Sequence, residues 1–238
     1  MEPARELRSP DAGEALPYSV DHADHRLRRP ELVVLQVDGT VSAIDGLAWL
    51  TSRRNSETAH GIDALLHEAA EQRWSWAELT RARLKHLRPR RAEINELGAA
   101  YLAALTRGAV ESVSALRRAG ISITLASDVA AEALFGVATA LGVSPNELQA
   151  PRIRFDAIGA YVGCDLGAVA AAASDPTGYR AATSSPRTLF VGTRRSEMFA
   201  PRGTDTFIAF SGVVALEGPS DAKASVSSFQ DLTALVLG

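Results

Sequence analysis

The chain has 238 residues, of which 46% are hydrophobic and 22% are charged, and its formal net charge is −3. This is the composition of a globular protein, and so near-neutral a balance gives no electrostatic basis for binding nucleic acid. No apolar run is long enough to span a bilayer, and the charged N-terminal residues are not those of a secretion signal. The single cysteine, Cys164, excludes an internal disulfide bond, so we expect a cytoplasmic protein with no membrane partner.

The first 30 residues are predicted to form a disordered tail. Four prolines interrupt this segment, charges of both signs are mixed in it, and no apolar periodicity emerges. His22 and His25 have a spacing that metal ligands can use. Because no helix and no further ligands accompany them, a solvated loop is the favoured interpretation.

A short apolar run, residues 32–35, is followed at once by the polar sequence of residues 36–40. A buried strand that ends in a polar loop is the typical start of a parallel α/β sheet. Ligands of such sheets bind outside the carboxyl ends of the strands. Gln36, Asp38 and Thr40 are therefore predicted to lie where chemistry would take place.

Residues 46–104 are predicted to be mostly helical, because leucine and isoleucine recur there at offsets of three and four residues. The stretch 81–91 within this block is rich in arginine. A solvated helix face is the ordinary interpretation of such a run. The alternative is a lid that offers cations to an anionic ligand.

Strands and helices alternate again after residue 104. Glycine closes both predicted helices, and a hairpin and two strands follow them. The predicted elements are a helix at 109–119, a strand at 121–126, a helix at 129–141, a hairpin at 150–163, and strands at 188–191 and 206–210. This order predicts an α/β fold with a parallel sheet.

Four motifs follow one another in a recognisable order. Residues 36–40 match the pattern D-x-D-G-T, except that Gln36 takes the place of the first aspartate. Ser127 follows the second strand, residues 154–163 match a glycine-containing hairpin pattern, and residues 191–197 correspond to a G-D-x-x-x-D motif. In this order the motifs resemble those of the haloacid dehalogenase (HAD) superfamily, specifically its phosphoserine-phosphatase-like branch.

The resemblance covers nearly all of the chain after the tail. It implies an α/β fold with a Rossmann-like core of residues 31–45 and 105–238, built on a parallel sheet. It also implies a small helical cap, residues 46–104, inserted after the first strand.

The resemblance further implies a chemistry. In this family the first aspartate attacks phosphorus, the second acts as general acid and base, and a hydroxyl group and a lysine bind the phosphoryl oxygens. Mg²⁺ is held by the first aspartate, a backbone carbonyl and an acidic residue of the last motif. Asp38 matches the acid/base, Ser127 matches the phosphate-binding hydroxyl, and Arg180 falls near the lysine position.

The nucleophile and a metal-binding carboxylate are both missing. Gln36 stands at the nucleophile position, and a neutral amide cannot form an acyl phosphate. Thr193 stands where the metal-binding aspartate is expected, and Glu197 is the second acid of that motif. Hard cations depend on carboxylate oxygens, so Mg²⁺ binding is expected to be weak or absent, and no cofactor is predicted. The loss of a catalytic nucleophile lowers rates by a factor on the order of 10⁶.

The resemblance points to further candidates for ligand binding. Asp45 lies near the position of a cap-side acid that recognises substrate, although a solvated loop aspartate is an equally favoured interpretation. Arg83 lies near a cap arginine that binds the substrate carboxylate, with the same balance of interpretations. Thr40 closes the first motif. Asp128 stands where the family usually has glycine and would place negative charge beside the phosphate pocket.

We therefore expect a HAD-fold protein that is not a competent phosphatase. The first hypothesis is a pseudoenzyme or accessory subunit that binds a partner protein, a second copy or a small anionic ligand, as in a biosynthetic complex. The second is a metal-independent enzyme that uses Asp38 as acid or base in elimination, cyclisation or ester cleavage. The third and least favoured is a weak phosphomonoesterase.

Overall fold

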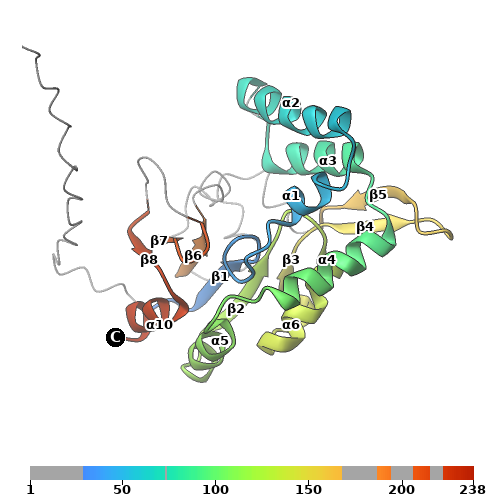
Figure 1. Cartoon of the computed structure of the whole chain (residues 1–238). Coiled ribbons are helices and arrows are strands. Elements are labelled where there is room, and N and C mark those ends of the chain that lie inside the picture. Colours follow the sequence, from blue (N-terminus) through green and yellow to red (C-terminus); the bar gives the residue numbers. More distant parts are fainter. Residues whose placement is uncertain (1–28, 73, 168–186, 194–205, 215–221) are drawn as a thin grey trace, which may run out of the picture.

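The computed structural model describes residues 29–72, 74–167, 187–193, 206–214 and 222–238 (Figure 1). Apart from its last two residues, the predicted tail at 1–30 lies outside the described residues, and so do His22 and His25. Within the described ranges, no helix combines the length and the apolar character that crossing a membrane requires.

A parallel sheet lies at the centre of the described chain, with six strands in the order β3-β2-β1-β6-β7-β8. The strands are β1 (Leu32–Gln36), β2 (Ser122–Ala126), β3 (Leu148–Gln149), β6 (Thr188–Gly192), β7 (Thr206–Phe210) and β8 (Ala224–Val226). The predicted α/β class with a parallel sheet is thus confirmed. Because β1 pairs with both β2 and β6, the carboxyl ends of these three strands meet at one edge of the sheet.

Both faces of the sheet are buried, which explains why the first four residues of β1 are all apolar. Val33 and Leu35 face the main core, whereas Leu32 and Val34 belong to a smaller cluster on the other face. Successive side chains of a strand point to opposite faces, so a strand covered on both sides is mostly apolar.

Three helices pack against the main core face: α5 (Ala109–Arg118), α6 (Phe135–Leu141) and α10 (Phe229–Leu237). The helix predicted at 129–141 begins later than expected and is preceded by a 3₁₀ turn, η1 (Ala131–Leu134). Ala130 is extended, and the N–H of Ala131 donates to the carbonyl of Pro151 instead of to a helical partner. Gly142 ends α6 in the left-handed conformation, as predicted.

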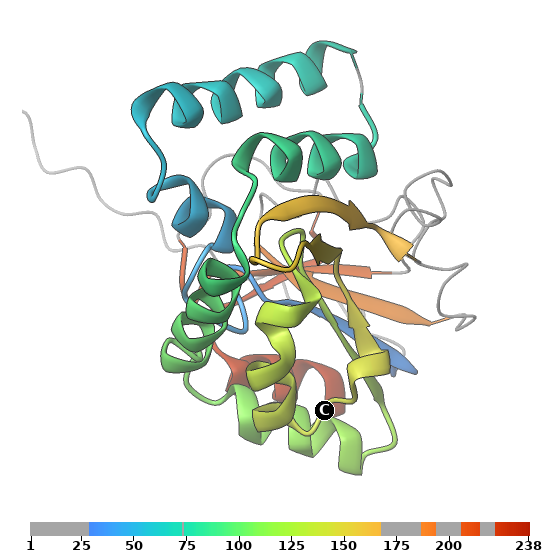
Figure 2. The same ribbon diagram turned by 90° about the vertical axis from the view of Figure 1, so that its right-hand side faces the viewer.

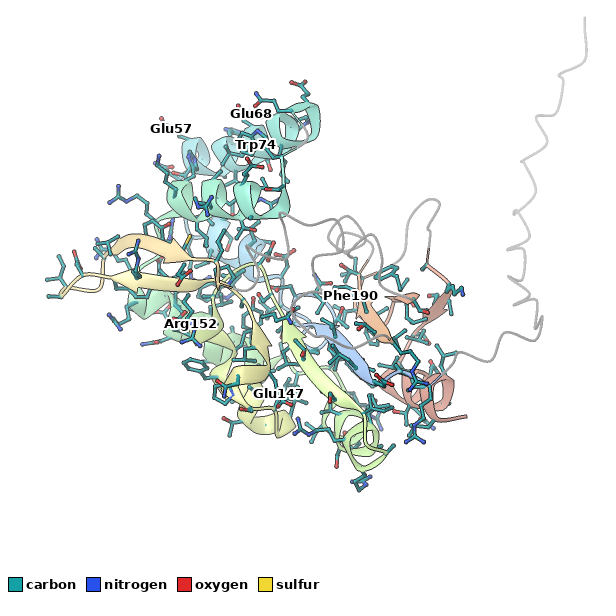
Figure 3. All side chains as sticks on the ribbon, turned by 180° about the vertical axis from the view of Figure 1, so that it is seen from behind. Glu57, Glu68, Trp74, Glu147, Arg152 and Phe190 are labelled. Atoms are coloured by element: carbon teal, nitrogen blue, oxygen red, sulfur yellow. The ribbon has the colours of Figure 1, made fainter. Side chains whose placement is uncertain are left out.

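Four helices lie between β1 and α5: α1 (Gly46–Thr51), α2 (Ser56–Gln72), α3 (Trp76–Leu87) and α4 (Arg91–Ala103). Figures 1 and 2 show α2 and α3 as a pair that stands away from the sheet, whereas α4 lies along α6. Glu57 and Glu68 on α2 point outward (Figure 3). The division into a core and a cap at residues 45 and 105 stays a prediction.

The predicted hairpin is also present. Its strands, β4 (Arg152–Phe155) and β5 (Tyr161–Asp165), pair antiparallel and form a separate two-stranded sheet beside α3. A second 3₁₀ turn, η2 (Pro145–Glu147), leads into β3.

Candidate functional site

The carboxyl ends of β1, β2 and β6 bring together residues that are far apart in the sequence. Gln36 ends β1, Ser127 directly follows β2, and Thr193 directly follows β6. The side-chain oxygen Oε1 of Gln36 accepts a hydrogen bond from the backbone N–H of Thr193 at 3.0 Å. The Thr193 hydroxyl lies 3.4 Å from the same oxygen. The family resemblance expects carboxylates at both of these positions. Here Gln36 and Thr193 are instead hydrogen bonded to each other.

The turn after β1 passes close to Thr193. Gly39 has a φ of +69°, which disfavours any residue with a side chain. A Cβ atom added at Gly39 would also lie 3.0 Å from Cγ2 of Thr193. Glycine at this position therefore lets the turn close and places Asp38 inward.

Asp38 is buried, with 6% of its surface exposed, and both of its carboxylate oxygens are hydrogen bonded. Oδ1 accepts from the backbone N–H of Gly46 at 2.8 Å and from the hydroxyl of Tyr101. Oδ2 accepts from the hydroxyl of Ser127 at 2.7 Å. The donors come from α1, from α4 and from the loop after β2, so one side chain joins three parts of the molecule to β1.

Burial dominates the electrostatics of this group. Loss of hydration raises the pKa of Asp38 above its ordinary value, and the hydrogen bonds from Tyr101, Ser127 and Gly46 oppose that rise. Burial and the neighbouring Asp38 raise the pKa of Tyr101, so its hydroxyl group keeps its proton and donates.

A second polar pair lies beside the first. Nη1 of Arg83, on α3, lies 3.5 Å from Oδ2 of Asp128, in the loop after β2. Burial and the charge of Asp38 raise the pKa of Asp128 to about 7, and the positive charge of Arg83 opposes this rise. Arg83 is only 6% exposed, whereas its neighbours Arg81 and Lys85 are exposed. The arginine-rich stretch is thus mostly a solvated face with one buried arginine.

The other predicted site residues are Asp45, Thr40, Arg180 and Glu197. Asp45 is exposed and caps the N-terminus of α1, accepting from the N–H of Ala48 at 2.9 Å. Thr40 is fully buried, and its hydroxyl has no hydrogen-bond partner within the described part of the chain. Arg180 and Glu197 lie outside the described residues.

Comparison with known proteins places this geometry in a fold. No family model and no curated protein matches the sequence. A phosphoserine phosphohydrolase-like protein from Francisella tularensis subsp. tularensis SCHU S4 superposes with a TM-score of 0.71 at 17% identity, covering 87% of this chain and 99% of that chain. The chain therefore shares the fold of this phosphoserine phosphohydrolase-like protein.

Two phosphoserine phosphatases superpose as well. A structure of phosphoserine phosphatase as a phospho-aspartyl intermediate analogue has a TM-score of 0.61 at 16% identity. The match covers 88% of this chain and 100% of that one. The phosphoserine phosphatase from T. onnurineus in complex with NDSB-201 has a TM-score of 0.58 at 16% identity, covering 90% and 98%. At these identities the likeness establishes a shared fold and leaves the activity to be argued from the site.

The donors described here are poorly suited to the Mg²⁺ ion that the family resemblance implies. Oε1 of Gln36 already accepts from Thr193, and an amide and a hydroxyl are weak replacements for two carboxylates. Among the described residues, no group of three or more His, Cys, Asp or Glu side chains is placed to hold a metal ion.

Tyr101 and Gly46 are site residues that the sequence analysis missed. Tyr101 lies 63 positions from Asp38 and follows Ile94 and Leu97 at helical spacing, so it looks like an ordinary core residue. Gly46 contributes only a backbone N–H, which no side-chain pattern marks. In both cases only the tertiary fold shows the contact with Asp38.

Proposed function

We propose that this HAD-fold protein acts by binding, as a pseudoenzyme or accessory subunit, and is not a competent phosphatase. The observation that carries the proposal is the 3.0 Å hydrogen bond from the N–H of Thr193 to the side chain of Gln36. It occupies the oxygen that stands at the nucleophile position. It also links this oxygen to the residue that stands at the metal-ligand position.

The surroundings of Asp38 support the same proposal. A general acid must reach the leaving group within hydrogen-bonding distance. Asp38 is 6% exposed, and its carboxylate is already bonded to Gly46, Tyr101 and Ser127. In this arrangement the side chain stabilises the fold and is not directed toward a substrate.

The proposed ligand is a partner protein or a small anion. Arg83 is a buried cation whose guanidinium lies 3.5 Å from Asp128. Its Nε has no hydrogen-bond partner among the described residues, so one donor is left for an anionic group.

A phosphatase assay with p-nitrophenyl phosphate and Mg²⁺ tests the proposal. The wild type is expected to show no turnover above background, and Gln36→Asp/Thr193→Asp is expected to gain measurable activity, because it supplies both missing carboxylates. The matched control is Gln36→Asn/Thr193→Asn, which changes the side chains similarly without adding charge and should stay inactive. Wild-type turnover as high as that of the aspartate variant would refute the proposal.

One observation favours a second candidate, a metal-independent enzyme. The pKa of Asp38 is raised, and its carboxylate lies 2.7 Å from the Ser127 hydroxyl, a pairing that suits acid–base chemistry. Turnover of this kind would persist in EDTA and disappear in Asp38→Asn. Activity that survives Asp38→Asn would exclude this candidate.

A further inference from the structure

The buried face of α3 is partly polar. Thr80, Arg83, Leu84 and Leu87 share this face at helical spacing, and all four are buried. Within the described chain, Oγ1 of Thr80 and Nε of Arg83 have no hydrogen-bond partner. Unpaired polar atoms weaken the attachment of a helix. The α2–α3 pair stands away from the sheet in both Figures 1 and 2, and α3 reaches the site through the contact of Arg83 with Asp128.

The surroundings of Asp128 hold more negative than positive charge. Four groups interact electrostatically with Asp128. They are Arg83 on α3, Asp38 in the turn after β1, Asp45 at the start of α1 and the hydroxyl of Tyr101 on α4. The guanidinium of Arg83 in turn interacts with two of the carboxyl groups, those of Asp128 and Asp45. Three hydrogen bonds favour the ionised form of Asp38 over its protonated form, whereas Asp128 meets Arg83 at the long distance of 3.5 Å.

We propose that Arg83 and Asp128 form a proton-dependent latch that holds α3 closed over the carboxyl edge of the sheet. With a proton on Asp128, the closed arrangement contains one negative charge fewer, and the acid still hydrogen bonds to Arg83. Without the proton, Asp128 and Asp38 repel each other at a site where burial weakens their hydration, and lifting α3 relieves this repulsion by admitting water.

The direction of the pH effect follows from the difference between the two states. In the closed state the pKa of Asp128 is raised to about 7, and in the open, hydrated state it returns toward its ordinary value. The closed state therefore binds the proton more tightly, so closure is favoured at low pH and opening increases as the pH rises through 7. For a closed-state pKa near 7, the opening equilibrium constant should rise about tenfold between pH 6 and pH 8.

Hydrogen exchange of the full-length protein, followed by mass spectrometry at pH 6 and pH 8, measures this opening. After correction for the intrinsic exchange rate, α3 amides of the wild type should open about tenfold more at pH 8. In Asp128→Asn, the opening of α3 should be the same at both pH values. The matched control, Glu147→Gln, neutralises a remote carboxylate that pairs with Arg117 at 3.1 Å, and it should keep the wild-type response.

A second variant keeps the latch testable if Asp128→Asn does not fold. Arg83→Gln removes the positive charge that lowers the pKa of Asp128, so the pH at which α3 opens should move upward relative to wild type. An unmoved transition in Arg83→Gln would overturn the latch, and so would identical pH responses in wild type and Asp128→Asn. Neither measurement depends on whether the protein binds a ligand or catalyses a reaction.

Discussion

Asp38 is the residue at which most of the described site converges. Its carboxylate accepts hydrogen bonds from α1, from α4 and from the loop after β2. Hydrogen bonds to an ionised group are about twice as strong as those between neutral groups, and in a buried pocket they are not weakened by water. Asp38 is therefore an anchor of the fold, whatever chemistry the site carries.

Replacing Asp38 by alanine is expected to lower the free energy of unfolding by about 2–4 kcal/mol. Alanine offers no acceptor, so the N–H of Gly46 and the hydroxyl groups of Tyr101 and Ser127 lose the carboxylate to which they donate. Urea denaturation followed by circular dichroism measures the loss. The control is Asp45→Ala, which removes an exposed carboxylate that caps a helix and should cost only about 1 kcal/mol. Equal, small losses in both variants would contradict the anchoring role.

The sequence predicted some of these residues better than others. Gln36, Asp38 and Thr193 were found because each follows a strongly apolar strand, and strand ends gather at one edge of a parallel sheet. Asp45 caps the N-terminus of α1, and the family motif gave no indication of this role. Tyr101 could not be found, because its contact with Asp38 depends on how α4 crosses the sheet edge and on no local pattern.

At the scale of elements, Gly46 at the start of α1 is packed too tightly to carry a side chain. A Cβ atom added at Gly46 would lie 1.9 Å from the hydroxyl oxygen of Tyr101 and 3.0 Å from Oδ1 of Asp38. Asp45 caps the helix and fixes its first turn, so the backbone of Gly46 cannot withdraw from this contact without losing the cap. The register of α1 and the position of α4 are therefore fixed together.

The substitution Gly46→Ala tests this coupling. It should lower the free energy of unfolding by about 1–3 kcal/mol or more, because Tyr101 must move and its bond to Asp38 is strained. Gly136→Ala on α6 is the matched control. There a Cβ atom meets nothing nearer than Leu102 at 3.7 Å, so the change should be neutral or stabilise the helix by about 0.5–1 kcal/mol. A Gly46→Ala variant as stable as Gly136→Ala would contradict the packing described.

For the whole molecule, prediction succeeded where a pattern was both local and strong. The apolar runs within β1, β2, β6 and β7 identified the sheet, because strands buried on both faces are mostly apolar. The two-residue β3 and the three-residue β8 are too short to show any period. The last helix, α10, has only nine residues and was not predicted, although its buried side chains close the core next to α5.

The C-terminal helix should therefore contribute strongly to stability. Phe229, at its first turn, is fully buried, and its ring centre lies 5.1 Å from that of Phe210 on β7. Phe229→Ala is expected to lower the free energy of unfolding by about 3–5 kcal/mol, because it leaves a cavity between α10 and the sheet. Leu237→Ala, on the same helix but with 39% of the leucine exposed, should change stability by less than about 1 kcal/mol. If urea denaturation gave the same small loss for both, α10 would not be the element that closes the core.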